Sequence, residues 1–285
     1  MSELRLLTVH AHADDETITM GGTLAQCDDR LIRTALVCCT DGQLATIYAP
    51  DMPEAETRPR LGEIRREELR AACTILGVDQ LDFLGYHDSG MAGAESNNDP
   101  VAFWKADLDE VAGRIVERIR AFRPHVVVTY DAIGSYMHPD HIQAHRATLL
   151  AVEAAYQPKI YPDAGEPWRV SKLYYTAFPL RAARRAVEFA AQFGQPSPFG
   201  DTAPEDLEFV TRDELVSTTV SCAPQMSRKL AALRAHRSQI TEDFPYLAVP
   251  EEMAREHFSD EYFQLAISRV PVQTPETDLF AGIGD

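Results

Sequence analysis

Strand-like and helix-like segments alternate along most of this 285-residue chain. Runs rich in Val, Ile, Leu and Thr are typical of buried strands, whereas apolar residues spaced three or four apart indicate amphipathic helices. We predict strands near residues 4–10, 33–39, 81–85, 125–130 and 172–178. We predict helices near residues 17–28, 57–76, 105–122, 140–156 and 180–194. The alternation indicates βαβ units, and therefore an α/β protein with a Rossmann-like, mostly parallel sheet flanked by helices.

The alternation ends where Pro and Gly residues cluster, between residues 196 and 204. A predicted helix at 224–240 and an aromatic-bearing stretch at 246–267 come after this break. We therefore divide the chain into an α/β core, residues 1–195, and a smaller C-terminal segment or lobe, residues 196–285. The second part is expected to pack on the core or to extend it.

A polar cluster follows the first predicted strand directly, because His12, Asp14, Asp15 and Glu16 lie within five residues. In open α/β sheets, ligands bind beyond the carboxyl ends of the strands. Carboxylates so close together repel one another unless a cation or protons hold them. Taken alone, the cluster fits equally well a solvated acidic turn in which one carboxylate caps the following helix.

A second polar cluster follows the Val-rich strand near 125–130 and contains Tyr136, His138, Asp140 and His141. The proline between the two histidines suits the first turn of a helix, where its missing N–H is not needed. This pattern places the second cluster at a helix start. We expect it at the same edge of the sheet as the first cluster.

His and Asp side chains from two strand ends are the usual components of a mononuclear zinc site. Such a site has about four ligands, and a catalytic one keeps a position for water. We predict that His12, Asp15 and His141 bind Zn²⁺, with Fe²⁺ as the alternative, because imidazole and carboxylate suit both ions. Asp14, beside the metal, is then the candidate base.

These motifs resemble a known family. The His-x-Asp-Asp-Glu turn and the His-Pro-Asp-His sequence about 125 positions later are similar to the zinc-dependent N-acetylglucosaminyl deacetylases of the PIG-L/LmbE-like superfamily. The resemblance is strongest to the mycothiol-pathway branch, which holds N-acetylglucosaminyl-inositol deacetylases and mycothiol S-conjugate amidases. Segments 65–69, 88–93 and 235–239 also match, so the resemblance covers residues 4 to about 240. Ala13 departs from the family, which normally has a rigidifying Pro there.

The resemblance implies an amidohydrolase that removes the N-acetyl group from a glucosamine-containing small molecule, such as an N-acetylglucosaminyl-inositol-like glycoside. Zinc would make water reactive near neutral pH. Asp14 would take the water proton and pass one to the leaving amine. His138, held protonated by Asp140, would stabilise the developing oxyanion together with the hydroxyl of Tyr136.

The resemblance also implies substrate contacts. In the family, residues that match Arg65 and Asp88 bind the sugar or polyol, and the residue that matches Met91 lines the pocket. Arg65 belongs to the helix before the third predicted strand, and Asp88 belongs to the loop after it. The fold could therefore bring both to the rim of the site.

Three other functions remain open. An amidase acting on thiol S-conjugates of the mycothiol type belongs to the same branch of the family. A Mg²⁺-dependent phosphoesterase could use Asp14, Asp15 and Glu16, but it would need more oxygen ligands. A non-catalytic carbohydrate-binding protein could share the fold after losing the metal. We expect His10 and His145 to be structural, because the metal site is complete without them.

The composition restricts the partners and the compartment. The net charge of −17, from 27 Lys and Arg against 44 Asp and Glu, opposes binding to nucleic acid or anionic membranes. No apolar stretch approaches ~20 residues, and the first strand begins the chain, so we expect a cytoplasmic enzyme. The five cysteines form no C-x-x-C pair and are expected to be buried and reduced. A small-molecule glycoside is the predicted partner, and homo-oligomerisation is left open.

Overall fold

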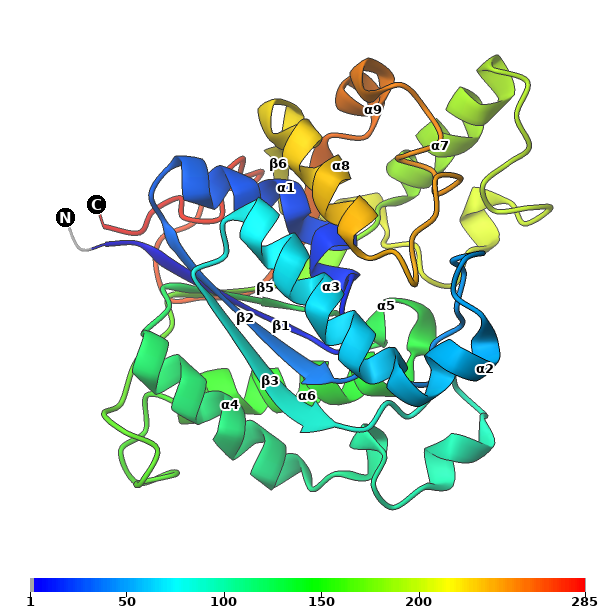
Figure 1. Cartoon of the computed structure of the whole chain (residues 1–285). Helices are drawn as coiled ribbons and strands as arrows, with labels where there is room; N and C mark the ends of the chain where they lie inside the picture. Colours follow the sequence, from blue (N-terminus) through cyan, green and yellow to red (C-terminus); the bar gives the residue numbers. More distant parts are fainter. Residues whose placement is uncertain (1–2, 285) are drawn as a thin grey trace.

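A seven-stranded sheet forms the centre of the computed structural model, which describes residues 3–284 (Figure 1). Its strand order is β3-β2-β1-β4-β5-β7-β6. The strands are β1 (Arg5–His10), β2 (Arg33–Thr40), β3 (Gln80–Tyr86), β4 (Val126–Thr129), β5 (Lys172–Ala177), β6 (Thr218–Ser221) and β7 (Asp260–Ser268). The first five run parallel, whereas β7 pairs antiparallel with both β5 and β6. The predicted α/β fold with a mostly parallel sheet is confirmed.

Helices cover both faces of this sheet (Figure 1). They are α1 (Asp15–Asp29), α2 (Glu54–Thr57), α3 (Leu61–Leu76), α4 (Leu108–Phe122), α5 (Gly134–Met137), α6 (Pro139–Ala154), α7 (Leu180–Gln192), α8 (Met226–Ala235) and α9 (Glu251–His257). Local signals set several ends. The Asp107 carboxylate caps α4 by accepting from two backbone N–H groups, and Gly77 ends α3 with a φ of 77° that glycine adopts without strain.

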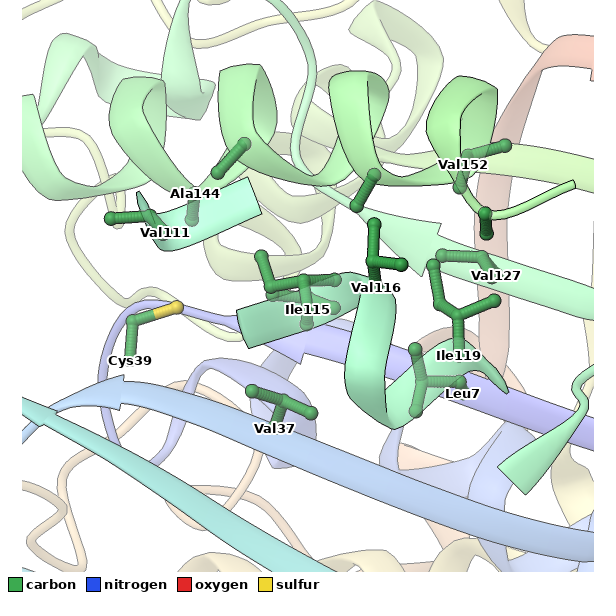
Figure 2. Close-up of a cluster of buried hydrophobic side chains, with 14 of the residues drawn as sticks. Leu7, Val37, Cys39, Val111, Ile115, Val116, Ile119, Val127, Ala144 and Val152 are labelled. Atoms are coloured by element: carbon green, nitrogen blue, oxygen red, sulfur yellow. The ribbon is translucent and has the colours of Figure 1, made fainter. Parts of the chain in front are cut away.

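The core on one face lies between the sheet, α4 and α6. Figure 2 shows Leu7, Val37 and Val127 of the strands beside Ile115 and Val116 of α4. All five side chains are fully buried. Burial of each such side chain contributes roughly 1.5–3 kcal/mol, so this layer fixes the strands whose carboxyl ends carry the polar clusters.

On the other face, α1 is broken at Met20, where the backbone leaves the helical region with φ −148° and ψ 20°. The Glu261 carboxylate accepts the N–H of Gly22 at 2.8 Å and caps the second half of the helix. Lys229 pairs with Glu261 at 2.7 Å, and both are buried. Gly22 is required because a Cβ there would lie 2.4 Å from the Cβ of Cys222. The break sets the direction of the first turn of α1, which carries the acidic cluster.

The C-terminal part adds to the same architecture, because β6 and β7 extend the sheet and α8 packs against α1 and α3. These two strands were not among the predicted ones. The proposed division at residues 195 and 196 stays a prediction. The five cysteines are free and buried, as expected. Within residues 3–284, none of the helices combines the length and apolarity that a bilayer crossing requires.

Candidate active site

The two polar clusters meet at the carboxyl ends of β1 and β4. This is the point where the strand order reverses, and open α/β sheets hold their ligands there. His12 lies on the turn after β1, Asp15 is the first residue of α1, and His141 lies in the first turn of α6. The sheet thus brings His12 and His141 into contact although they are 129 positions apart.

Three potential metal ligands form a small triangle of buried atoms. His12 Nδ1 lies 3.1 Å from His141 Nε2, and Asp15 Oδ2 lies 3.6 Å and 3.5 Å from these two nitrogens. A tetrahedral zinc ion with bonds of about 2.0–2.2 Å separates its ligand atoms by about 3.3–3.6 Å. The residues present therefore fit a zinc ion, and they are the three that the sequence predicts as ligands.

The charges of this cluster favour a cation. Burial opposes ionisation of Asp15, but His141 and His12 outweigh it and hold its pKa well below the usual value. Burial lowers the pKa of His141 to about 3, which leaves a neutral imidazole of the kind that binds metals. Burial also acts against protonation of His12, yet its hydrogen bonds to Asp140, Asp15 and Asp88 raise its pKa well above the usual value.

The second nitrogen of His12 faces a different carboxylate. His12 Nε2 lies 3.2 Å from Asp140 Oδ2, and Asp140 is fully buried. The backbone N–H of Ser89 donates to the same oxygen at 2.9 Å, and the Ser89 hydroxyl donates to the other one. A carboxylate that accepts from Nε2 fixes the tautomer in which Nδ1 is free to bind a metal. Ser89 was not predicted from the sequence.

The protonated state expected for His138 stays a prediction. The Asp140 carboxylate was expected to hold His138 protonated, but it contacts His12 and Ser89. His138 instead accepts the backbone N–H of Asp140 at its Nδ1, at 3.2 Å. Burial, together with His12 and His141, lowers the pKa of His138 to about 4, whereas the nearby Asp140 and Asp88 act in the opposite direction. His138 contacts the backbone and not the Asp140 carboxylate because it caps α6, with its Nδ1 turned toward the start of the helix.

Tyr130 is a second residue that sequence reasoning missed. Its hydroxyl donates to Asp15 Oδ2 at 2.6 Å and accepts the N–H of Ala11 at 2.6 Å. Its ring stacks on His141 with a centroid distance of 4.1 Å. His145 Nδ1 lies 2.9 Å from the Tyr130 carbonyl oxygen. Tyr130 follows β4 directly, and this position at a strand end is the one sequence signal that could have indicated it.

Asp14 has an unusual backbone conformation, with φ 100° and ψ −31°. Residues with side chains seldom adopt positive φ, so neighbouring groups must hold it there. Its N–H donates to Glu16 Oε2 at 3.1 Å, and its carboxylate lies 3.4 Å from Arg65 Nη2. Burial raises the pKa of Asp14 to about 6 against the opposing charge of Arg65. A carboxyl group with such a pKa suits general base catalysis near neutral pH.

Arg65 is buried and holds the loops around the site. Its Nη2 donates to the Ala13 carbonyl at 2.6 Å, and its Nη1 donates to the Gly42 carbonyl at 3.0 Å. Gly42 has a φ of 61°, which favours glycine, and a Cβ there would lie 2.1 Å from Nη1 of Arg65 and displace the guanidinium. The donors of Arg65 thus contact the protein itself, including the backbone that precedes Asp14.

Two more of the predicted residues, Asp88 and Tyr136, lie beside the same centre. Asp88 is buried, with Oδ1 3.6 Å from His12 Nε2 and 4.0 Å from His138 Nε2. The hydroxyl of Tyr136 lies 3.5 Å from His141 Nε2, and its side chain is partly exposed. Met91 is exposed on the loop after β3. The fold therefore gathers loops from three strands at one edge.

This fold and this site define an α/β enzyme with a buried His/Asp centre suited to a metal ion. Residues 7–152 match the family model described as PIG-L, GlcNAc-PI de-N-acetylase. The chain therefore belongs to the PIG-L family and is an amide-hydrolysing enzyme. The family predicted from the two motifs is confirmed.

Similar proteins agree with this assignment. The chain is 44% identical to 1D-myo-inositol 2-acetamido-2-deoxy-alpha-D-glucopyranoside deacetylase from Geodermatophilus obscurus, with 98% of both chains covered. N,N'-diacetylchitobiose deacetylase from Pyrococcus horikoshii matches with a TM-score of 0.62 at 21% identity, over 93% of this chain and 84% of that one. A 4-carboxy-2-hydroxymuconate hydratase from Pseudomonas putida matches with 0.61 at 19%, over 95% and 99%. The structural matches show the fold alone, and the hydratase shows that this fold serves more than one reaction.

Proposed function

We propose that this protein is a zinc-dependent deacetylase of an N-acetylglucosaminyl glycoside, with inositol as the first candidate aglycone. The observation that carries the proposal is the buried triangle of His12, Asp15 and His141, with separations of 3.1–3.6 Å. The deacetylase that is 44% identical over almost the whole chain supports the glycoside and the inositol. The substrate loses acetate and keeps a free 2-amino group.

The metal would be held by His12, Asp15 and His141, with Asp140 and Tyr130 orienting two of these ligands. Zinc in such a site supplies Lewis acidity and makes water acidic enough to react near neutral pH. Fe²⁺ is the alternative ion, because it accepts the same nitrogen and oxygen donors. Asp140 contacts the ring of His12, and Tyr130 stacks on the ring of His141, so both imidazoles are held in place.

Asp14 moves the proton. It lies next to the ligand Asp15 in the sequence, and its carboxylate contacts Arg65. As water attacks the acetyl carbon, the Asp14 carboxylate takes a proton from it. When the C–N bond breaks, the carboxyl group gives this proton to the leaving amine, which restores the carboxylate.

His138 and Tyr136 stabilise the negative oxygen that develops on the acetyl group. The Nδ1 of His138 accepts a backbone N–H, so the neutral ring carries its proton on Nε2 and can donate from there. The Tyr136 hydroxyl is the second donor. Donors fixed in place before the reaction stabilise the transition state without reorganising. A protonated His138 is not needed for this role.

Asp88 and Met91 remain the predicted substrate contacts on the loop after β3. Asp88 presents a carboxylate beside His12 and His138, where it can accept hydrogen bonds from vicinal sugar hydroxyls. Arg65 also remains a predicted contact, although its Nη atoms hold backbone carbonyls in the structure. Its contact with Asp14 gives it a second task at the site.

Two alternatives are less well supported. An amidase of thiol S-conjugates would use the same centre, and only the substrate distinguishes it. A Mg²⁺-dependent phosphoesterase fits poorly. Mg²⁺ prefers an octahedral shell of oxygens, whereas two of the three proposed ligand atoms are imidazole nitrogens. The cytoplasmic location stays a prediction, and the oligomeric state stays open.

Acetate release tests the proposal. The zinc-loaded protein is assayed on N-acetylglucosaminides that differ only in the aglycone, with inositol, methyl and N-acetylglucosaminyl members, and on a mycothiol S-conjugate. We expect the highest kcat/KM on the inositol glycoside. Faster cleavage of the S-conjugate would favour the amidase, and no hydrolysis of any compound would contradict the proposal.

A further inference from the structure

The backbone of Asp14 is held from two sides. Arg65 contacts the preceding carbonyl and the Asp14 carboxylate on one side. On the other side, the Asp14 N–H donates to Glu16 Oε2 at 3.1 Å. A residue with positive φ costs about 1–3 kcal/mol and persists only when its surroundings fix it. Glu16 supplies one of these fixing contacts, although it touches none of the proposed ligand atoms through its side chain.

Glu16 is itself held by a residue from the far end of the chain. His236 Nε2 lies 3.1 Å from Glu16 Oε1, and the two residues are 220 positions apart. The Thr17 hydroxyl also donates to Oε1. Glu16 and His236 are both fully buried. The two oxygens of one carboxylate are thus divided between His236 and the backbone of Asp14.

The segment that carries His236 is anchored firmly. His236 is the residue after α8, at the point where the helix ends. Two residues later, the N–H and the hydroxyl of Ser238 donate to the two oxygens of the buried Glu68 on α3, each at 2.7 Å. This anchor fixes the position of His236 relative to Glu16. Segment 235–239, which resembles the family, therefore links α3 to the first turn of α1 through Ser238 and His236.

We propose that Glu16 and His236 are positioning residues that hold Asp14 in the conformation required for its proton transfers. The inference rests on the proposed function, in which Asp14 is the base. It also gives residues 196–285 a role at the site, although none of the proposed chemical groups comes from them. Loss of either contact releases the Asp14 peptide, while the metal ligands keep their own contacts.

The test uses pairs of variants at each position. Glu16→Ala and His236→Phe remove the contact, whereas Glu16→Gln keeps an acceptor oxygen and His236→Gln keeps a donor. Glu276→Gln is the matched control, because Glu276 is a buried carboxylate that pairs with Lys172 away from the site. For each protein we measure zinc per chain, thermal midpoint, kcat and KM on the same glycoside, with kcat expressed per folded, zinc-loaded chain.

We expect Glu16→Ala and His236→Phe to lower kcat by about 10- to 100-fold with KM nearly unchanged, because outer contacts and small displacements have effects of this size. The two Gln variants should recover most of kcat. Glu276→Gln should lower the thermal midpoint and leave kcat unchanged. Unchanged kcat in both Glu16→Ala and His236→Phe overturns the inference, as does the same loss in the Gln variants. A wild-type protein that releases no acetate refutes the proposed function itself.

Discussion

Two buried polar clusters in this protein differ in how their charges are matched. In one, Glu276 accepts from Lys172, from Tyr174 at 2.6 Å and from Thr218 at 3.1 Å, so each carboxylate oxygen faces a donor. In the other, the nitrogens of His12 and His141 face one another at 3.1 Å beside Asp15. The first cluster is complete within the chain. The second presents buried nitrogen and oxygen atoms at separations that fit a metal ion.

The two clusters also differ in place. The Glu276 cluster joins a late segment to β5 and β6, and its contacts lie along strands. The His12 cluster lies on turns beyond the ends of β1 and β4. Strand contacts serve stability, whereas residues at strand ends can meet a ligand. The comparison therefore predicts that substitutions in one cluster change stability and substitutions in the other change metal binding and activity.

The largest effect is expected at a ligand. His141→Ala should lose bound zinc and activity together, because one imidazole of the triangle is gone while Tyr130 still holds Asp15. Metal analysis of the purified variant and an acetate-release assay measure both. Stoichiometric zinc in His141→Ala would show that the ligand assignment is wrong.

The next effect concerns stability. Lys172→Met leaves the Glu276 carboxylate buried without its cation and should lower the free energy of unfolding by about 3–5 kcal/mol. Urea denaturation measures this value, and zinc content should stay at the wild-type level. Arg184→Met is the control, because Arg184 pairs with Glu205 at the exposed surface and should leave the midpoint nearly unchanged. Equal midpoints for Lys172→Met and wild type would remove the distinction between the clusters.

A third prediction separates metal binding from chemistry inside the site. Asp14→Asn should keep zinc, because Asp14 is proposed as the base, while kcat falls by roughly 10²-fold or more. Zinc content and kcat on one glycoside are measured on the same preparation. Near-normal turnover would assign proton transfer to another residue.

The smallest effect is expected at the substrate loop. Asp88→Ala should lower kcat/KM for the glycoside. The corresponding loss of transition-state stabilisation is about 1–3 kcal/mol, the value expected for a hydrogen bond to a bound hydroxyl. Zinc should be retained. Kinetics on the whole glycoside panel are the measurement. Unchanged kinetics on every member would leave Asp88 as a turn residue that accepts the Gly90 N–H at 2.8 Å.

The sequence was sufficient for features that depend on neighbouring residues. The five parallel strands and the ligand candidates follow from local patterns, because both polar clusters begin directly after strong strand signals. β6 was missed because Val220 is the only apolar residue among its four, and β7 because polar residues such as Glu261 interrupt its pattern. Glu261 is polar for a tertiary reason, since it caps the broken helix α1.

Contacts between distant segments could not be predicted. Tyr130 meets Asp15 across 115 positions, Ser89 meets Asp140 across 51, and His236 meets Glu16 across 220. No periodicity or local motif encodes such pairs. The contact between Asp140 and His12 has the same origin, because His138 is near Asp140 in the sequence, whereas the Asp140 carboxylate lies 3.2 Å from Nε2 of His12, 128 positions away.

Zinc titration tests the central claim most directly. The protein is freed of metal with a chelator, Zn²⁺ is added in steps, and acetate release from N-acetylglucosaminyl-inositol is measured at each step. The account predicts that activity rises in proportion to zinc up to one ion per chain, and that His12→Ala shows no such rise. Full activity in the metal-free protein, or an equal rise in His12→Ala, would contradict it.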